Sequence, residues 1–283
     1  MKVNIFSTDG KVIKQIELPK QFNEPIRFDI IKRAVLVVQS AKISPYGSYK
    51  KAGQGYSSII SKRRRDYKTS YGKGIARTQR KIMTKRGTQF HWIGATAPNT
   101  VGGRRAHPPK PEKIWLININ KNERKKAIRS ALAATLDLEL VKKRGHKIDK
   151  LINVVDSKVE EISKTNEIEK ILLNMGLNNE LNRISKKKIR AGRGKSRGRK
   201  YKTKVGPLLV VSKKCNLQKA AENIQGVDCS IVNDLNAEKL APGTIPGRFT
   251  IFTEDALKIM VSKNLFLNNK KGVPKKWSHY FIL

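Results

Sequence analysis

The clearest chemical pattern in the sequence is a short run of lysines and arginines that glycines interrupt. Residues 186–204 read KKKIRAGRGKSRGRKYKTK and hold eleven Lys and Arg and no acid. Planar guanidinium groups bind phosphate oxygens through paired hydrogen bonds, and glycines let the backbone turn tightly beside such a group. The pattern therefore predicts phosphate contacts. We expect them from the following side chains: Arg190, Arg193, Lys195, Arg197, Arg199, Lys200 and Lys202.

A nucleotide-binding loop is the alternative for the same segment, because Gly194-Lys195-Ser196 matches the end of a P-loop. A P-loop also needs a glycine five positions before Gly194, where this sequence has Ile189. Lysines precede the segment in place of the apolar strand that a P-loop follows. We therefore prefer contacts with a phosphate backbone.

A second basic segment, residues 44–113, is longer and rich in glycine, proline and aromatic residues. It holds 17 Lys and Arg against two acids, together with nine glycines and five prolines. Unpaired RNA would offer phosphates to the cations and base faces to the aromatic rings. The alternative is a disordered basic linker with incidental aromatics. We expect phosphate contacts from Arg63, Arg64, Arg65, Lys73, Arg77 and Arg80, and base stacking from Tyr46, Tyr49, Tyr56, Tyr67, Tyr71, Phe90 and Trp92.

The overall charge favours the same class of partner. The 283 residues include 61 Lys and Arg against 22 Asp and Glu, a formal net charge of +39, and the two segments hold about two thirds of this excess. Such a charge attracts RNA or, less often, an anionic membrane surface. A membrane-associated protein would need a broad apolar helix face beside its charge, whereas these segments are rich in Gly and Pro. No apolar run approaches the roughly 18 residues of a membrane span, and the N-terminus lacks an apolar signal core, so we expect a cytoplasmic chain.

Catalytic and metal-binding patterns are missing from the sequence. The histidines at 91, 107, 146 and 279 have no Cys or carboxylate partner at useful spacing, and Cys215 and Cys229 lack metal-site spacing. We interpret both cysteines as small core residues and His146 as a structural or RNA-contacting residue. An RNA-modifying enzyme would need a cofactor loop or an acid–base pair. We expect no enzyme activity, no cofactor and no metal, and any structural Mg²⁺ would belong to the RNA.

Strands alternate with helices through the rest of the chain. Residues 3–6 and 12–18 flank the turn Asp9-Gly10 and predict a hairpin, and 208–211 is a continuous apolar run typical of a buried parallel strand. This order predicts an α/β layered domain with a mainly parallel sheet, formed by 1–43 and 114–283 and interrupted by the extended loop 44–113. We also expect strands at 227–232 and 249–252, a short apolar segment at 151–155, and helices at 25–38, 120–143, 165–175, 217–223 and 254–262.

The helix at 120–143 has a charge pattern that calls for an anion. Asn120 and Glu123 fit a capping box, and Gly145 fits a left-handed helix end. Cations crowd the N-terminal half, where the helix dipole disfavours them. An external phosphate would resolve this conflict, and we expect Arg124 and Arg129 to bind it.

Six blocks of the sequence, in this order, resemble a known family. They are GKGIAR (72–77), VGGRRAHPPK (101–110), NKNERKKAIRSALAAT (120–135), RGH (144–146), RAGRGKSRGRKY (190–201) and LAPGTIPGRFTIFTEDAL (240–257). Together they resemble universal large-subunit ribosomal protein number four, over roughly 3–262. The form looks archaeal, because GGRRAHPP is the archaeal and eukaryotic wording and the long eukaryotic C-terminal extension is missing.

The resemblance implies a structural protein of the large ribosomal subunit that binds large-subunit rRNA and supports subunit assembly. Its long loop would thread into the rRNA and reach the wall of the polypeptide exit tunnel, beside the nascent polypeptide and neighbouring large-subunit ribosomal proteins, with no membrane partner. Residues 102–107 would lie on the returning arm, where Arg104, Arg105 and His107 would bind rRNA, and 190–201 would face rRNA. The sequence departs from the family at Thr78-Gln79-Arg80 and matches it poorly over 82–97. The loop tip would comprise Lys68, Thr69, Ser70, Tyr71, Gly72, Lys73 and Gly74.

Overall fold

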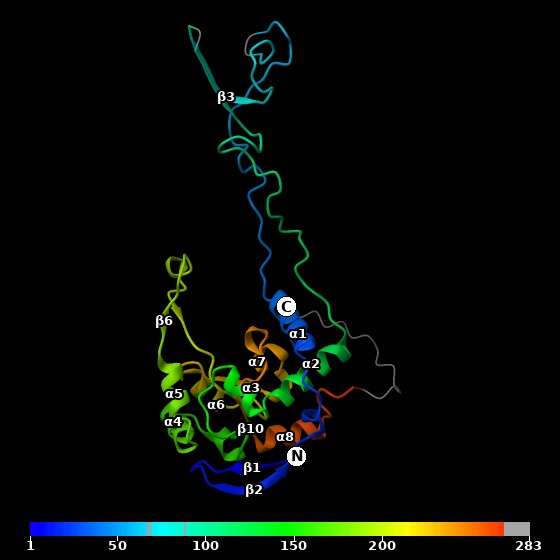
Figure 1. The fold of residues 1–283 in the computed structure, drawn as a ribbon, viewed down its shortest axis with the longest axis vertical. Coiled ribbons are helices and arrows are strands. Elements are labelled where there is room, and N and C mark those ends of the chain that lie inside the picture. The colour runs from blue at the N-terminus through cyan, green and yellow to red at the C-terminus, as the bar shows by residue number, and fades with distance from the viewer. Residues whose placement is uncertain (67–68, 88, 269–283) are drawn as a thin grey trace. The chain divides into compact units, whose positions relative to one another are not determined.

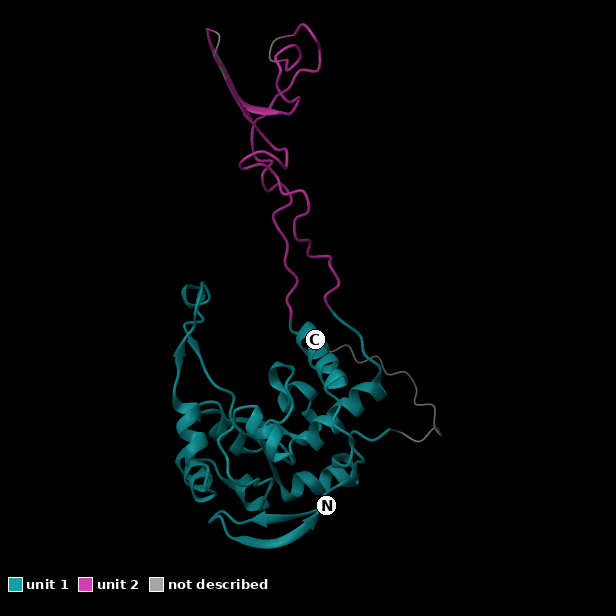
Figure 2. Ribbon diagram, in the orientation of Figure 1, with its two compact units in different colours: residues 1–42, 116–283 teal, residues 43–115 magenta. Residues whose placement is uncertain are grey.

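The computed structural model describes residues 1–66, 69–87 and 89–268 (Figure 1). It divides the chain into two compact units (Figure 2). Unit 1 consists of Met1–Lys42 and Leu116–Leu283, and unit 2 of Ile43–Trp115. Each unit is described below by itself.

Unit 1 is built on a six-stranded sheet with the strand order β2-β1-β5-β10-β8-β9. Only β1 and β2 pair antiparallel, as the hairpin expected around Asp9-Gly10, and the other neighbours are parallel. The prediction of an α/β fold with a mainly parallel sheet is confirmed. The strands are β1 (Lys2–Phe6), β2 (Val12–Glu17), β5 (Val154–Val155), β8 (Leu208–Val211), β9 (Asp228–Ile231) and β10 (Thr250–Thr253).

Helices cover both faces of this sheet, so each central strand is buried on two sides. Leu208 and Val210 of β8 pack into one apolar cluster, and Leu209 and Val211 pack into the other. This explains the continuous apolar run at 208–211. The first cluster includes residues of α1 (Phe28–Ala41), α2 (Lys121–Ala134), α7 (Ala237–Leu240) and α8 (Glu254–Ser262). The second includes residues of α3 (Leu138–Lys143), α4 (Thr165–Asn174), α5 (Asn178–Ser185) and α6 (Asn216–Glu222).

The single helix expected at 120–143 is wrong, because the chain forms two helices there, α2 and α3. The Thr135 hydroxyl donates to the Leu132 carbonyl as α2 ends, and Oδ1 of Asp137 accepts from the next backbone N–H groups to start α3. The capping box is also wrong: Asn120 makes no side-chain cap bond, and Glu123 pairs with Arg33 at 3.0 Å.

Other local signals in the sequence are confirmed. Thr253 caps α8 by accepting a hydrogen bond from the Ala256 N–H at 3.3 Å. Gly145 has a φ of 103°, which places it in the left-handed region expected after a helix end. The sequence does not predict α5 or two short hairpins, β3 (Arg80–Arg86) with β4 (Gln89–Gly94), and β6 (Lys188–Ile189) with β7 (Tyr201–Lys202).

Within unit 1 the chain departs for unit 2 after α1 and returns just before α2. The Ile117 N–H donates to Oγ of Ser40 at 3.1 Å, and Ser40 is buried at the end of α1. This hydrogen bond holds the departing and returning segments together.

Candidate nucleic-acid interface

Unit 2 begins and ends as two extended arms that run antiparallel. The Ser48 N–H donates to the Pro109 carbonyl at 3.2 Å, and the rings of Tyr46 and Trp115 stack with centroids 5.6 Å apart. Gly53 has a φ of 72°, and its Cα faces the Gly103 backbone so closely that a Cβ would collide with it. Here glycine is required, because the two backbones touch.

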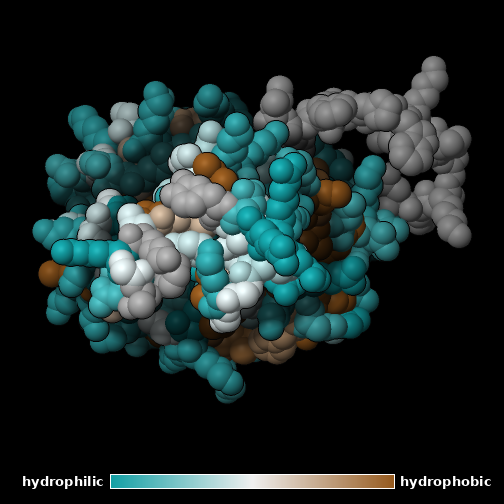
Figure 3. All heavy atoms as spheres, turned by 90° about the horizontal axis from the view of Figure 1, so that it is seen from above, coloured by the Kyte–Doolittle hydropathy of each residue, from teal (hydrophilic) through white to brown (hydrophobic). Residues whose placement is uncertain are grey.

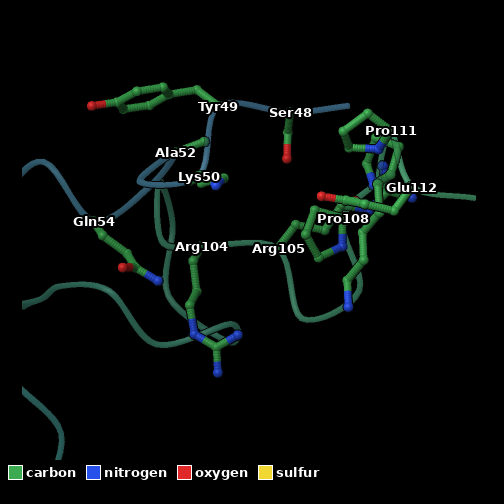
Figure 4. Close-up of a pocket in the computed structure, with 12 residues that line it drawn as sticks. Ser48, Tyr49, Lys50, Ala52, Gln54, Arg104, Arg105, Pro108, Pro111 and Glu112 are labelled. Atoms are coloured by element: carbon green, nitrogen blue, oxygen red, sulfur yellow. The ribbon is translucent and has the colours of Figure 1, made fainter. Parts of the chain in front are cut away.

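A cleft of about 770 Å³ opens between these arms (Figure 4). Residues 48–54 line one side and residues 104–112 line the other. Tyr49 is 73% exposed and Arg104 and Arg105 are both exposed, so an aromatic ring and two guanidinium groups border the same cleft. This combination fits a nucleotide, whose base stacks and whose phosphate binds cations.

Five exposed arginines of unit 2 lack carboxylate partners among the described residues. Arg63, Arg64 and Arg65 are exposed and make no ion pair there, and the same holds for Arg104 and Arg105. His107 is exposed as well. Such groups are available for an external polyanion.

The aromatic rings are less available than the sequence suggested. Several already face a cation of their own chain, which satisfies the ring face electrostatically. Tyr67 and the side chain of Phe90 lie outside the described part of the chain. In four pairs the cation lies 4.1 to 4.4 Å from the ring centroid: Lys73 with Trp92, Arg77 with Tyr71, Lys81 with Tyr56, and Lys113 with Trp115.

The predicted loop tip is partly folded inward. Thr69 and Ser70 are buried, and Nζ of Lys73 donates to the Thr69 carbonyl at 2.8 Å. Gly72 and Gly74 are exposed and have positive φ, Tyr71 is half-buried, and Lys68 lies outside the described residues. The exposed part of the tip therefore begins at residue 72.

Arg80 makes its contacts within unit 2. Its guanidinium donates to the Ala76 carbonyl at 2.6 Å and to the Trp92 carbonyl at 3.2 Å. This side chain braces β3 and β4, so an RNA-contacting role has less support for Arg80 than for the exposed arginines.

The Arg/Gly segment at 186–204 forms a hairpin of its own (Figure 1). Its two short strands pair Lys188 with Lys202, and Gly198 turns the chain with a φ of 77°. Nε of Arg190 donates to the Arg199 carbonyl at 3.1 Å. Its other predicted contact residues, Arg193, Lys195, Arg197, Arg199, Lys200 and Lys202, are exposed and form no ion pair with a described carboxylate.

The cations of α2 are largely compensated by the protein itself. Nε of Arg129 lies 2.9 Å from Glu24 and its Nη1 donates to the Phe266 carbonyl at 2.7 Å, with Arg129 only 8% exposed. Lys126 also pairs with Glu24. Arg124 stays exposed. Arg129 thus pairs with Glu24 of the same chain in place of the external phosphate that the sequence predicts. Of the two predicted residues, only Arg124 is exposed to solvent.

The histidines, cysteines and carboxylates of the described chain form no candidate metal site, because no group of three or more of them could hold a metal ion. Burial raises the pKa of Cys215 and raises that of Cys229 to about 12, as expected for inert thiols packed against the core. His146 is a buried structural residue, and His279 lies beyond the described residues.

None of the helices described is both long and apolar enough to cross a membrane. Figure 3 shows one face of the molecule, where hydrophilic side chains cover most of the surface and apolar ones form small patches. The candidate interface consists of those five arginines of unit 2 and the exposed cations of the 186–204 hairpin, none of which forms an ion pair with a described carboxylate.

Comparison with known proteins assigns the chain to a family. The pattern of the family described as "Ribosomal protein L4/L1 family" matches residues 16–263. The chain belongs to the ribosomal protein L4/L1 family. This L4/L1-family membership confirms the resemblance seen in the sequence and the expectation of a ribosomal protein without enzymatic activity.

Curated relatives of this L4/L1-family chain are named large ribosomal subunit protein uL4. The relative from Nanoarchaeum equitans is 49% identical over 94% of this chain and 100% of its own. Those from Archaeoglobus fulgidus and Methanosphaera stadtmanae are 42% and 40% identical over 92% and 95% of this chain and 98% and 99% of their own. All three are archaeal, in agreement with the archaeal wording of GGRRAHPP.

Proposed function

We propose that the chain is a structural constituent of the large ribosomal subunit that binds large-subunit rRNA and supports subunit assembly. Family membership and the name of the archaeal relatives support the first part. The observation that carries the proposed rRNA binding is that the exposed cations of the candidate interface have no described carboxylate partners. Other cations of unit 1 do have such partners, as Lys14 has Glu254. Cations that a fold leaves unpaired are the groups with which RNA phosphates replace their counterions.

The salt dependence of binding tests this proposal. The full chain is titrated with deproteinised large-subunit rRNA at several KCl concentrations, beside a variant that carries Arg193→Gln, Arg197→Gln and Arg199→Gln. Each lost phosphate contact lowers the slope of log K against log salt by about 0.7 to 0.9, so the triple variant should lose about two to three. The matched control neutralises three exposed lysines outside both basic segments, at 170, 213 and 219. Equal slopes for the two variants would refute the contact assignment.

We further propose that unit 2 contributes to the wall of the polypeptide exit tunnel and lies beside neighbouring large-subunit proteins. Support comes from the family and from the exposed, glycine-rich stretch at 72–77. The test uses stalled ribosomes whose nascent chain carries one photoreactive residue. The position of this residue is varied along the chain, counted from the residue that is attached to the tRNA. Crosslinks to 72–77 at one narrow range of distances are expected, and their absence at every distance would overturn the tunnel assignment.

A further inference from the structure

A basic cleft of about 410 Å³ lies in unit 1 at the root of the 186–204 hairpin. It is lined mainly by cations and contains no carboxylate and no aromatic ring other than the imidazole of His146. The cationic residues are Arg144 after α3, Arg183 of α5, and Lys188, Lys202 and Lys204 of the hairpin. Arg144, Lys188 and Lys204 are not among the individual side chains for which the sequence predicts an RNA contact.

Arg144 is the unusual member of this cleft. Its guanidinium donates to the carbonyls of Ile245 and Pro242, which are neutral acceptors, and it makes no ion pair with a described carboxylate. Its two arginine neighbours do have such partners. Arg183 lies 2.6 Å from Glu180, and Arg248 lies 2.5 Å from Asp228.

This arrangement leaves an uncompensated positive charge in a half-buried place. Burial, together with Arg248 and Arg183, lowers the pKa of Arg144 to about 10. A guanidinium that lacks a counterion in such surroundings gains from any anion that enters, because screening by water is weak there. The cleft therefore has the electrostatics of an anion site.

Hydrogen bonds fix the side chains of His146 and Arg183, which line the cleft. The Nδ1 atom of His146 bonds to Glu180 at 2.6 Å, and its Nε2 accepts from the Phe249 N–H at 3.3 Å. Glu180 also holds Arg183 and accepts from the Lys147 N–H at 2.9 Å. Donors that are fixed before an anion arrives lose little conformational entropy when it binds.

We propose that this cleft binds one phosphate of an RNA backbone, between the guanidinium of Arg144 and the ammonium groups of Lys188, Lys202 and Lys204. The proposal rests on the proposed rRNA binding and adds a specific site to it. A backbone phosphate fits better than a free nucleotide, because the cleft offers no aromatic platform for a base. Lys188 and Lys202 face each other in the hairpin and also line the cleft, so an RNA strand that contacts the cations of the hairpin would pass the cleft.

The test compares Arg144→Gln with a control that carries Lys143→Gln, an exposed lysine one position before it on α3. Titration of the full chain with deproteinised large-subunit rRNA against KCl should show, for Arg144→Gln, a slope lower by about 0.7 to 0.9 and affinity reduced about tenfold at 0.1 M salt. Arg144→Lys should restore most of the slope. The control should lose neither. Equal slopes for Arg144→Gln and the control would overturn the site.

Two further measurements distinguish an RNA phosphate site from a local structural effect of Arg144 and from a site for free phosphate. Because Arg144 also ties two loop carbonyls, the double variant Lys188→Gln/Lys204→Gln repeats the test without touching that contact. Its slope should again fall by about 0.7 to 0.9, since the cleft holds one phosphate. If wild-type protein fails to bind rRNA, the proposed function itself fails, together with this site. If millimolar inorganic phosphate stabilises wild type but not Arg144→Gln while their rRNA slopes agree, the cleft takes free phosphate, and the assignment to RNA is overturned.

Discussion

Oε1 of Glu180 lies 2.6 Å from Nδ1 of His146, and both side chains are almost completely shielded from solvent. Because the Phe249 N–H donates to Nε2, the ring must carry its proton on Nδ1 and is neutral. The pair joins the segment after α3 to α5, and the Phe249 bond adds the residue just before β10. A single imidazole therefore fixes three elements that are distant in the sequence.

This pair makes stability dependent on pH. Burial lowers the pKa of His146 below 6.5, and the hydrogen bonds from Arg183 and His146 outweigh burial and lower the pKa of Glu180 to about 2. For His146 the unfolded chain binds the proton more readily, so stability is fully present above pH 6.5 and falls as pH drops below it. For Glu180 the loss follows between about 4.5 and 2.

Urea denaturation of the full chain at pH 7.5, 6.5 and 5.5 measures the effect. The free energy of unfolding should fall by up to about 1.4 kcal/mol per pH unit below 6.5. His146→Gln should be less stable throughout and should lack this part of the pH dependence. Parallel curves for the two proteins would contradict the neutral, buried imidazole.

Asp137 is the second position where one side chain decides local structure. Its Oδ1 accepts from the N–H groups of Glu139 at 2.9 Å and Leu140 at 3.3 Å, which starts α3 after the break from α2. Asp137→Ala should reduce the free energy of unfolding by about 1 kcal/mol, and Asp137→Asn should retain most of it. Glu139→Ala, which removes the same charge two residues later, is the control. A loss as large in Glu139→Ala would attribute the effect to charge and not to capping.

The glycines of unit 2 allow a matched pair of substitutions. At Gly53 a Cβ would meet the Gly103 backbone and φ is positive, whereas at Gly55 a Cβ would meet nothing within 4 Å. Gly53→Ala should separate the arms and weaken rRNA binding about tenfold, since backbone strain of this kind costs about 1–3 kcal/mol. Gly55→Ala should bind as wild type does. Equal affinity of the two variants in the same titration would show that the arms need not close on RNA.

Unit 2 should lack stable order in the free protein. Ala95 is the one buried apolar residue among its described positions, so little burial offsets the entropy of ordering this segment. Amide exchange within 43–115 should be fast in the free chain and slow once the protein is bound to large-subunit rRNA. Strong protection in the free chain would reject coupled folding and binding.

Much of unit 1 could be predicted from sequence because its signals are local. The alternating hairpin around Asp9-Gly10, the apolar run of β8 and the Thr253 cap each follow from neighbouring residues. The break between α2 and α3 could not be seen, because apolar residues recur at i, i+4 spacing through both helices, at Ile128, Leu132, Leu136 and Leu140. The hairpin of β6 and β7 could not be seen either, because each strand contains two residues.

The candidate interface was predicted by composition, and its details depend on distant contacts. The sequence shows how many cations each segment contains, but not which of them form ion pairs with carboxylates of the folded chain. Glu24 lies about a hundred positions before Arg129, and their pairing became visible only in the folded chain. Arg144 was overlooked for the opposite reason. An arginine after a helix end is common in sequences, and only the fold shows that Arg183 and Arg248 form ion pairs whereas Arg144 forms none with a described carboxylate.

The hydrogen bond from Ile117 to Ser40 has a consequence for how this protein can change over time. Unit 1 holds the two ends of residues 43–115 together through its own hydrogen bond. A longer segment between these ends therefore does not change how unit 1 is closed. Loop-closure entropy grows slowly, by about 0.6 kcal/mol for each doubling of length. The length and composition of 43–115 can therefore drift to suit a different RNA landscape, while the sheet and its two helical layers stay as they are.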